Sequence, residues 1–205
     1  MNYLEFKQKM FKPACFNINQ IYAWQPHFDK NNLTRWIKKG LLLRLKQGYY
    51  TFPEYKNIPG YSYYFANRIY KPSYISLHTA LSFYGIIPEA VVQITSVSSQ
   101  KTALFKNDIG EYSYKTVKNE LMFGYALIKQ SDSQAIQFAE PEKALLDLLY
   151  LYPFYNTVQE VRELRLDEDF LNDDLDIDKM KAFTDRFKNK ALTKRVKLLF
   201  EAYEL

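Results

Sequence analysis

Residues 31–52 read NNLTRWIKKGLLLRLKQGYYTF, and this stretch decides how the start of the chain is expected to fold. Leu33, Trp36 and Ile37 recur at the spacing of one helical face. This spacing predicts a helix over Lys30–Lys39 with these three side chains turned toward a core.

The ends of this helix and the segment after it carry their own signals. Asp29 is placed to cap the start of the helix, and Gly40 to end it in a left-handed conformation. Two apolar runs flank Lys46-Gln47-Gly48, a pattern that predicts two strands joined by a tight turn.

Two shorter helices are expected upstream. NYLEFKQKMF places Leu4, Phe6, Met10 and Phe11 on roughly one side of a helix within residues 2–12. NINQIYAW indicates a second helix capped by Asn17. Three small helices followed by a two-stranded wing are the layout of a winged helix-turn-helix domain, which we expect over residues 1–55.

The charge of the chain is concentrated in this first part. Residues 1–60 contain ten Lys and Arg against three acids, whereas residues 61–205 contain 18 against 20. An excess confined to one part of a chain indicates an anionic partner for that part. We therefore expect the unit to bind double-stranded DNA.

Side chains on the outer side of the third helix and on the wing are the expected contacts. Asn31 and Asn32 suit adenine edges and Arg35 suits guanine, while the lysines suit phosphates. The full expected set is Lys30, Asn31, Asn32, Thr34, Arg35, Lys38, Lys39, Arg44, Lys46 and Gln47. A solvated face on a small protein-binding module is the alternative interpretation of the same pattern.

The rest of the chain is expected to form a second, mixed α+β domain over residues 61–205, after a linker at 53–60 that contains two prolines and a glycine. Its helices and strands do not alternate regularly, which favours α+β over a parallel α/β sheet. The expected helices are YSYYFANRIY, SLHTALSFYG, EPEKALLDLLYL, TVQEVREL and two segments between Asp178 and Tyr203, and the expected strands are VVQITSVSS, GEYSYKTV, ELMFGYALIK and AIQFA.

No residue pattern predicts catalysis, a cofactor or a metal site. Cys15 is a lone cysteine, and His78 lies among apolar neighbours. The acidic run LDEDFLNDDLDID (166–178) lacks the glycine and glutamate of an EF-hand loop in either register, so we interpret it as a solvated loop with a helix cap. The chain shows no apolar run long enough to span a membrane and no signal peptide, so we expect a cytoplasmic protein.

Several segments together resemble a known family. YISLHTALSFYGIIPEAVVQITSVSSQKT, GEYSYKTVKNELMFGYALIK, AEPEKALLDLLYLYP and LTRWIKKGLLLRLKQGYYTF occur in the order found in AbiEi-type antitoxins of type IV toxin–antitoxin systems. The resemblance covers roughly residues 15–155. These proteins are also described as transcriptional regulators of viral defence loci.

The resemblance implies an N-terminal winged helix that represses the promoter of its own operon, and a C-terminal domain that provides the antitoxin activity. Its functional partner would be an AbiEii-type nucleotidyltransferase toxin, without a stable complex between the two. The family often carries two basic residues at the wing tip, and here the second is Gln47, which removes one phosphate contact. Two copies are expected on a repeated DNA site.

Two other classes of function remain as alternatives. A protein-interaction module would bind a partner through the C-terminal domain and would not bind DNA. An enzyme would use a polar pocket built from residues such as His78, Glu140, Glu142 and Lys143.

Overall fold

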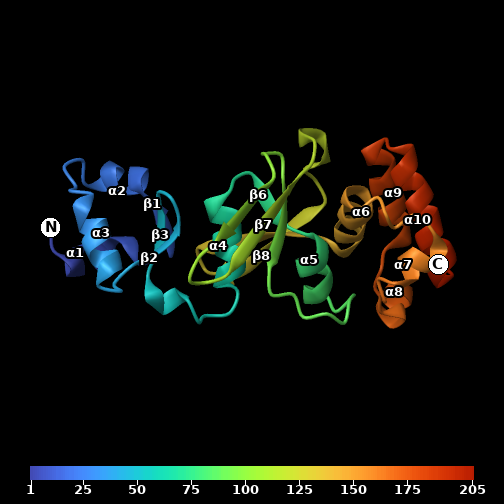
Figure 1. The fold of residues 1–205 in the computed structure, drawn as a ribbon, viewed down its shortest axis with the longest axis horizontal. Helices are drawn as coiled ribbons and strands as arrows, with labels where there is room; N and C mark the ends of the chain where they lie inside the picture. Colours follow the sequence, from blue (N-terminus) through green and yellow to red (C-terminus); the bar gives the residue numbers. More distant parts are fainter.

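A computed structural model describes residues 1–205 as a mixed α+β fold with ten α-helices and two β-sheets. The molecule is elongated (Figure 1). The N-terminal helices and the smaller sheet form one end, the larger sheet lies in the middle, and the last helices form the other end. The two termini therefore lie at opposite ends of the molecule.

Three helices and a three-stranded antiparallel sheet make up the N-terminal unit, with β3 between β1 and β2. The elements are α1 (Tyr3–Met10), β1 (Cys15–Asn17), α2 (Ile18–Trp24), α3 (Asn31–Lys38), β2 (Leu43–Lys46) and β3 (Tyr49–Thr51). Asn2 with Glu5, and Asn17 with Gln20, form capping boxes at the starts of α1 and α2. These local signals explain why two short helices begin where they do.

The core of this unit is built largely from aromatic rings. The Phe6 ring lies 4.6 Å from Trp36, 5.5 Å from Phe16 and 5.7 Å from Phe28, measured between centroids. Phe6 and Phe16 are almost completely buried. One expectation for this core is wrong: Leu4 is 70% exposed, because α1 turns Phe6 and Met10 inward instead.

The segment between the two sheets is more ordered than a free linker. Pro53–Tyr55 form a short 3₁₀ helix, and the buried Tyr55 donates a hydrogen bond to the Phe11 carbonyl at 2.8 Å. Gly60, at φ +82°, precedes α4 (Tyr61–Ile69). Only residues after Tyr55 remain as a short exposed connection.

The central sheet has six strands in the order β6-β7-β5-β4-β9-β8, with parallel pairs β4–β9 and β5–β7 and antiparallel pairs elsewhere. Helices α4 and α5 pack on its strands, and α6 contacts α5, α9 and α10. The elements after α4 are β4 (Ser73–Ile75), α5 (Leu77–Phe83), β5 (Ile94–Ser98), β6 (Ala103–Lys106), β7 (Glu111–Thr116), a 3₁₀ helix (Asn119–Leu121), β8 (Tyr125–Ser131), β9 (Gln134–Ala139), α6 (Pro141–Leu151), α7 (Val158–Arg162), α8 (Glu168–Asp173), α9 (Ile177–Phe187) and α10 (Lys190–Tyr203).

The sequence did not predict β1, β4, β6 or α8, each of which is only three to six residues long. ELMFGYALIK is not one strand, because its first residues form the 3₁₀ helix and Gly124, at φ +68°, separates them from β8. No helix combines the length and the apolar composition that crossing a membrane requires.

Candidate nucleic-acid interface

Helix α3 is fixed to the N-terminal core by the apolar residues that the sequence assigned to its inner side. Leu33 and Trp36 are buried, and Ile37 is half-buried. The Trp36 ring also lies 5.5 Å from that of Tyr3, in an edge-on arrangement. Gly40 follows the helix at φ +67°, the left-handed conformation that glycine tolerates best.

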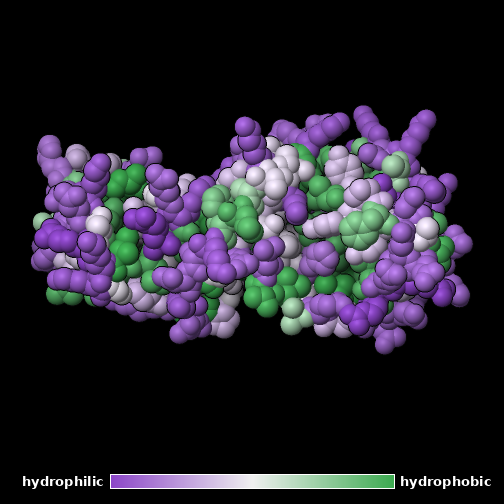
Figure 2. Space-filling view, viewed as in Figure 1, coloured by the Kyte–Doolittle hydropathy of each residue, from purple (hydrophilic) through white to green (hydrophobic).

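The opposite side of α3 carries exposed cations and short polar side chains. The exposed residues here are Lys30, Asn31, Thr34, Arg35, Lys38 and Lys39. No acid lies within the helix. Hydrophilic residues lie over much of the end of the molecule that carries α1–α3, with apolar residues visible between them (Figure 2). The outer side of α3 is thus a compact cationic surface on a rigid base.

Asn32 and Arg35 are not independent of one another. Asn32 is half-buried, and Arg35 Nη2 donates a hydrogen bond to Asn32 Oδ1 across one helical turn. The expectation that Asn32 pairs with an adenine edge would require this amide oxygen to be released. Arg35 keeps its other N–H groups for a partner.

The start of α3 holds a carboxylate as well as cations. Asp29 Oδ1 accepts a hydrogen bond from the Asn31 backbone N–H at 2.9 Å, although Lys30 occupies the capping position itself. Asp29 is therefore not the capping residue that the sequence predicted, because the helix begins one residue later and Lys30 precedes it without a side-chain cap. The negative charge of Asp29 interacts favourably with the N-terminus of α3. It also reduces the positive potential beside Lys30 and Asn31.

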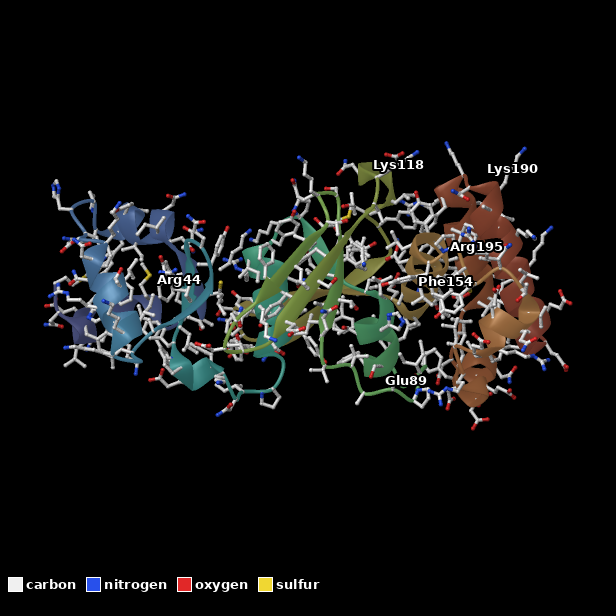
Figure 3. All side chains as sticks on the ribbon, viewed as in Figure 1. Arg44, Glu89, Lys118, Phe154, Lys190 and Arg195 are labelled. Atoms are coloured by element: carbon white, nitrogen blue, oxygen red, sulfur yellow. The ribbon has the colours of Figure 1, made fainter.

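The β2–β3 hairpin, which the sequence predicted to be a wing, has one exposed cation instead of two. Arg44 on β2 and Gln47 at the turn are exposed. Arg44 lies on the N-terminal unit, on the side that faces the larger sheet (Figure 3). Gly48, at φ +80°, makes the tight turn between the strands.

Lys46, which the sequence assigned to phosphate binding, lies instead against the end of α4 and strand β6 of the central sheet. Its Nζ donates a hydrogen bond to the Ile69 carbonyl at 3.2 Å. The same atom lies 4.9 Å from the Tyr70 ring centroid and 4.6 Å from that of Phe105. Burial lowers the pKa of the Lys46 ammonium. The structure thus places the half-buried Lys46 in contact with the second part of the chain, and its predicted role in phosphate binding would require this contact to be released.

A second contact joins the wing to the sheet. Asn107, in the turn between β6 and β7, donates from Nδ2 to the Leu45 carbonyl at 2.8 Å. On the other side of the junction, Gln134 Nε2 donates to the Lys12 carbonyl at 2.9 Å, and Tyr64 donates to the Pro13 carbonyl at 3.2 Å. The N-terminal unit is therefore held against the rest of the chain by residues distant in the sequence.

The lone cysteine is part of the core, and the acidic run supplies helix caps. Cys15 is buried, and burial raises the pKa of its thiol to about 12. Asp167 and Asp176, both from the acidic run, accept hydrogen bonds from backbone N–H groups at the starts of α8 and α9. The run contains two helix caps instead of the one expected, but the expectation of a loop is wrong, because Glu168–Asp173 form α8.

The polar residues named for an enzyme are engaged with different partners. His78 packs its ring against Tyr152, and burial lowers its pKa. Glu140 and Glu142 both contact Lys179 of α9, at 3.2 and 3.0 Å.

Lys143 forms an ion pair with Asp147 in the core, where both side chains are fully buried. The sequence analysis missed Asp147, although its spacing of four residues from Lys143 on a helix was a usable signal.

No group of three or more His, Cys, Asp or Glu side chains is placed to hold a metal ion. The sequence matches no protein-family model, and a search of curated proteins finds no match.

Proposed function

We propose that the chain is a DNA-binding antitoxin and autorepressor of a type IV toxin–antitoxin operon, with residues 1–55 forming a winged helix-turn-helix domain. The order of elements in the N-terminal unit supports this: helix, strand, helix, helix, strand, strand, with β3 central in the sheet. In such a domain α3 would enter a major groove and the β2–β3 turn would follow the adjacent backbone.

The observation that carries the proposal is the exposed cationic side of α3. Four cations, Lys30, Arg35, Lys38 and Lys39, are exposed there, and Arg44 adds a fifth from β2. Each cation that neutralises a phosphate releases counterions, so binding should weaken with salt. Asn31 and Thr34 lie among these cations and would reach base edges.

The antitoxin part of the proposal rests on the family resemblance. It assigns residues 61–205 to an antitoxin domain and an AbiEii-type nucleotidyltransferase toxin as the functional partner, not stably bound. It also makes the protein a cytoplasmic component of viral defence. Two copies of the chain would bind a repeated site in the promoter.

The test is a titration of the operon's promoter fragment with the full chain at several salt concentrations. The logarithm of the association constant should fall linearly with the logarithm of salt, with a slope of about −4.5 if about five phosphates are contacted. Arg35→Glu combined with Lys38→Glu should abolish binding.

A matched control reverses two charges on another helix. Lys190 and Lys194 are exposed on α10, and Lys190 points into solvent at the far end of the molecule (Figure 3). Lys190→Glu with Lys194→Glu should bind as the wild type does. A salt-independent isotherm, or an equal loss in both double variants, contradicts the proposal.

The alternative function is a protein-interaction module in which the N-terminal unit is a scaffold. The docking of Lys46 on the central sheet favours it, since that contact removes one cation from the wing. It predicts that the promoter fragment is not shifted and that the chain co-purifies with a partner bound to the C-terminal domain. In toxicity assays with the neighbouring gene, the chain would then protect cells from the toxin without repressing the promoter of the operon.

A further inference from the structure

A hollow of about 340 Å³ lies on the larger part of the chain, apart from α3. Its walls come from the end of α4 and the turn after it, and from strands β8 and β9. The lining residues are Asn67, Arg68, Lys71, Pro72, Leu127, Ala135 and Gln137.

Two cations and no acid line this hollow. Arg68 is half-buried and stacks its guanidinium over the Tyr64 ring, 5.7 Å from the centroid. Lys71 is exposed, and its pKa is lowered, first by partial desolvation and then by the positive charge of Arg68. Neither side chain has a carboxylate partner among the ion pairs of the molecule. An anion placed between them would relieve their mutual repulsion.

The buried side-chain amide of Asn67, in the wall of this hollow, has a donor group without a partner. Asn67 is only 6% exposed, and its Oδ1 accepts the Gln137 backbone N–H at 2.6 Å. Its Nδ2 is buried and donates to no protein atom. Buried donors are nearly always satisfied, so this N–H₂ group calls for an acceptor from outside the chain.

A second hollow of about 320 Å³ adjoins the first, because Leu127 and Ala135 line both. The Leu127 side chain is 69% exposed. Asp132 and Lys129, the charged residues of this second hollow, are paired with each other at 2.8 Å. The buried Gln134 Oε1 lacks a donor. The second hollow is therefore mainly polar and carries no unpaired charge, unlike the first.

We propose that the two hollows form one site for a small phosphate-bearing ligand of the nucleotide class, independent of the DNA surface. The phosphate group would lie between Arg68 and Lys71 and accept a hydrogen bond from Asn67 Nδ2. The rest of the ligand would cover Leu127 and donate to Gln134 Oε1. Because Gln134 also bonds to Lys12, the ligand would lie at the junction of the two sheets.

Calorimetric titration of the full chain with three probes tests this site: adenosine 5′-monophosphate, sodium phosphate and adenosine. We expect adenosine 5′-monophosphate to bind more tightly than phosphate, and adenosine to give no measurable heat. Lys71→Gln should weaken binding of the monophosphate about tenfold, as expected from the loss of one charge-assisted hydrogen bond.

Asn67→Asp is the sharper variant, because it keeps the oxygen that accepts from Gln137 and removes the donor. It should weaken phosphate binding more than Lys71→Gln does. Lys194→Gln, which removes an exposed charge from α10, is the control and should bind as the wild type does. Thermal unfolding of each variant shows whether it is folded. If Asn67→Asp does not fold, the comparison of Lys71→Gln with the wild type tests the site.

The outcomes separate this site from the DNA-binding proposal, because no DNA is present in the titration. Absence of binding by phosphate and monophosphate at millimolar concentration overturns the site, as does unchanged binding by Lys71→Gln. Equal affinity for phosphate and monophosphate overturns the role of the second hollow. Weaker promoter binding by Lys71→Gln, without binding of either small anion, would show that the surface meets a duplex backbone and would also overturn the proposal.

Discussion

Lys143 and Asp147, one turn apart on α6, form an ion pair in the centre of the larger core. Asp147 Oδ2 accepts hydrogen bonds from the Tyr74 and Ser76 hydroxyls, each at 2.8 Å. Lys143 Nζ lies 4.7 Å from the Phe187 ring centroid. Burial lowers the pKa of Lys143, and the charge of Asp147 opposes this shift. The pair is fully buried, so each charge depends on the other.

Removing one partner of this pair should destabilise the protein strongly. Asp147→Ala leaves an uncompensated ammonium in the core and should lower the free energy of unfolding by about 3–5 kcal/mol. Lys143→Met combined with Asp147→Ala should recover part of this loss, because no charge remains buried. Urea denaturation measures both. If the double variant is less stable than Asp147→Ala, the buried charge is not the cause of the loss.

His78 should make stability depend on pH. Burial lowers its folded-state pKa below the ordinary value of about 6.5, so the unfolded chain binds the proton more readily. The stabilising contribution of neutral His78 is present above pH of about 6.5 and is lost as pH falls toward the folded-state pKa.

The two histidines of the chain provide a matched comparison for this effect. His27 is exposed, so His27→Gln should lose as much stability between pH 7.5 and pH 5.5 as the wild type. His78→Gln should lose less over the same interval. Urea denaturation at the two pH values decides this, and equal losses in all three proteins would contradict the assignment to His78.

At the scale of elements, the local signals of the N-terminal unit predicted its helices well. The inward Leu33 and Trp36, the cap by Asn17 and the end at Gly40 all follow from spacing and capping within one helix. The burial of Lys46 could not be predicted in this way, because its partners Ile69 and Phe105 are far along the chain.

The larger sheet likewise contains features that local sequence signals could not predict. Strand β4 is only Ser73–Ile75, too short for a pattern of alternating residues, and its position follows from pairing with β5 and β9. The amide of Asn67 and the cations around it likewise lie in a helical segment that the sequence marks mainly by its tyrosines. Sites formed by tertiary contacts give little local signal.

Substitutions in the β2–β3 hairpin test whether its contact with the second part of the chain persists when DNA binds. Arg44 is exposed, whereas Lys46 is bound to the central sheet. Arg44→Gln should therefore weaken promoter binding and reduce the salt slope by about 1. Lys46→Met should leave the salt slope unchanged and lower the stability of the protein, by about 1–2 kcal/mol for a lost hydrogen bond and cation–π contacts.

Gel shifts across salt and urea denaturation separate these two effects. A salt slope reduced equally by both substitutions would show that Lys46 leaves the sheet when DNA binds.

At the scale of the whole molecule, charge is divided along the long axis. The cationic α3 lies at one end, and the acidic segment around α8 lies at the other (Figure 1). Residues 157–178 contain nine acids against two arginines, which opposes the basic excess of residues 1–60. A polyanion should attract the first end and repel the second.

Neutralising part of the acidic end should speed association with DNA at low salt. Asp173 and Asp174 are exposed and their side chains make no hydrogen bond, so Asp173→Asn with Asp174→Asn changes charge with little effect on packing. The association rate with the promoter fragment should rise about twofold near 10 mM salt, where screening extends over about 30 Å, and not at 1 M. Stopped-flow fluorescence measures this, and an increase at both salt concentrations would contradict an electrostatic origin.

The position of β4 between β5 and β9 has a consequence for the growing polypeptide. Its second neighbour begins only at Gln134, so translation must pass Ala139 before the middle of the sheet can close. Until then β4 presents an open edge, of the kind that pairs with other chains. The N-terminal unit, complete by Thr51, can form much earlier on the ribosome. This edge of β4 therefore stays unpaired until the strand that ends at Ala139 has been made.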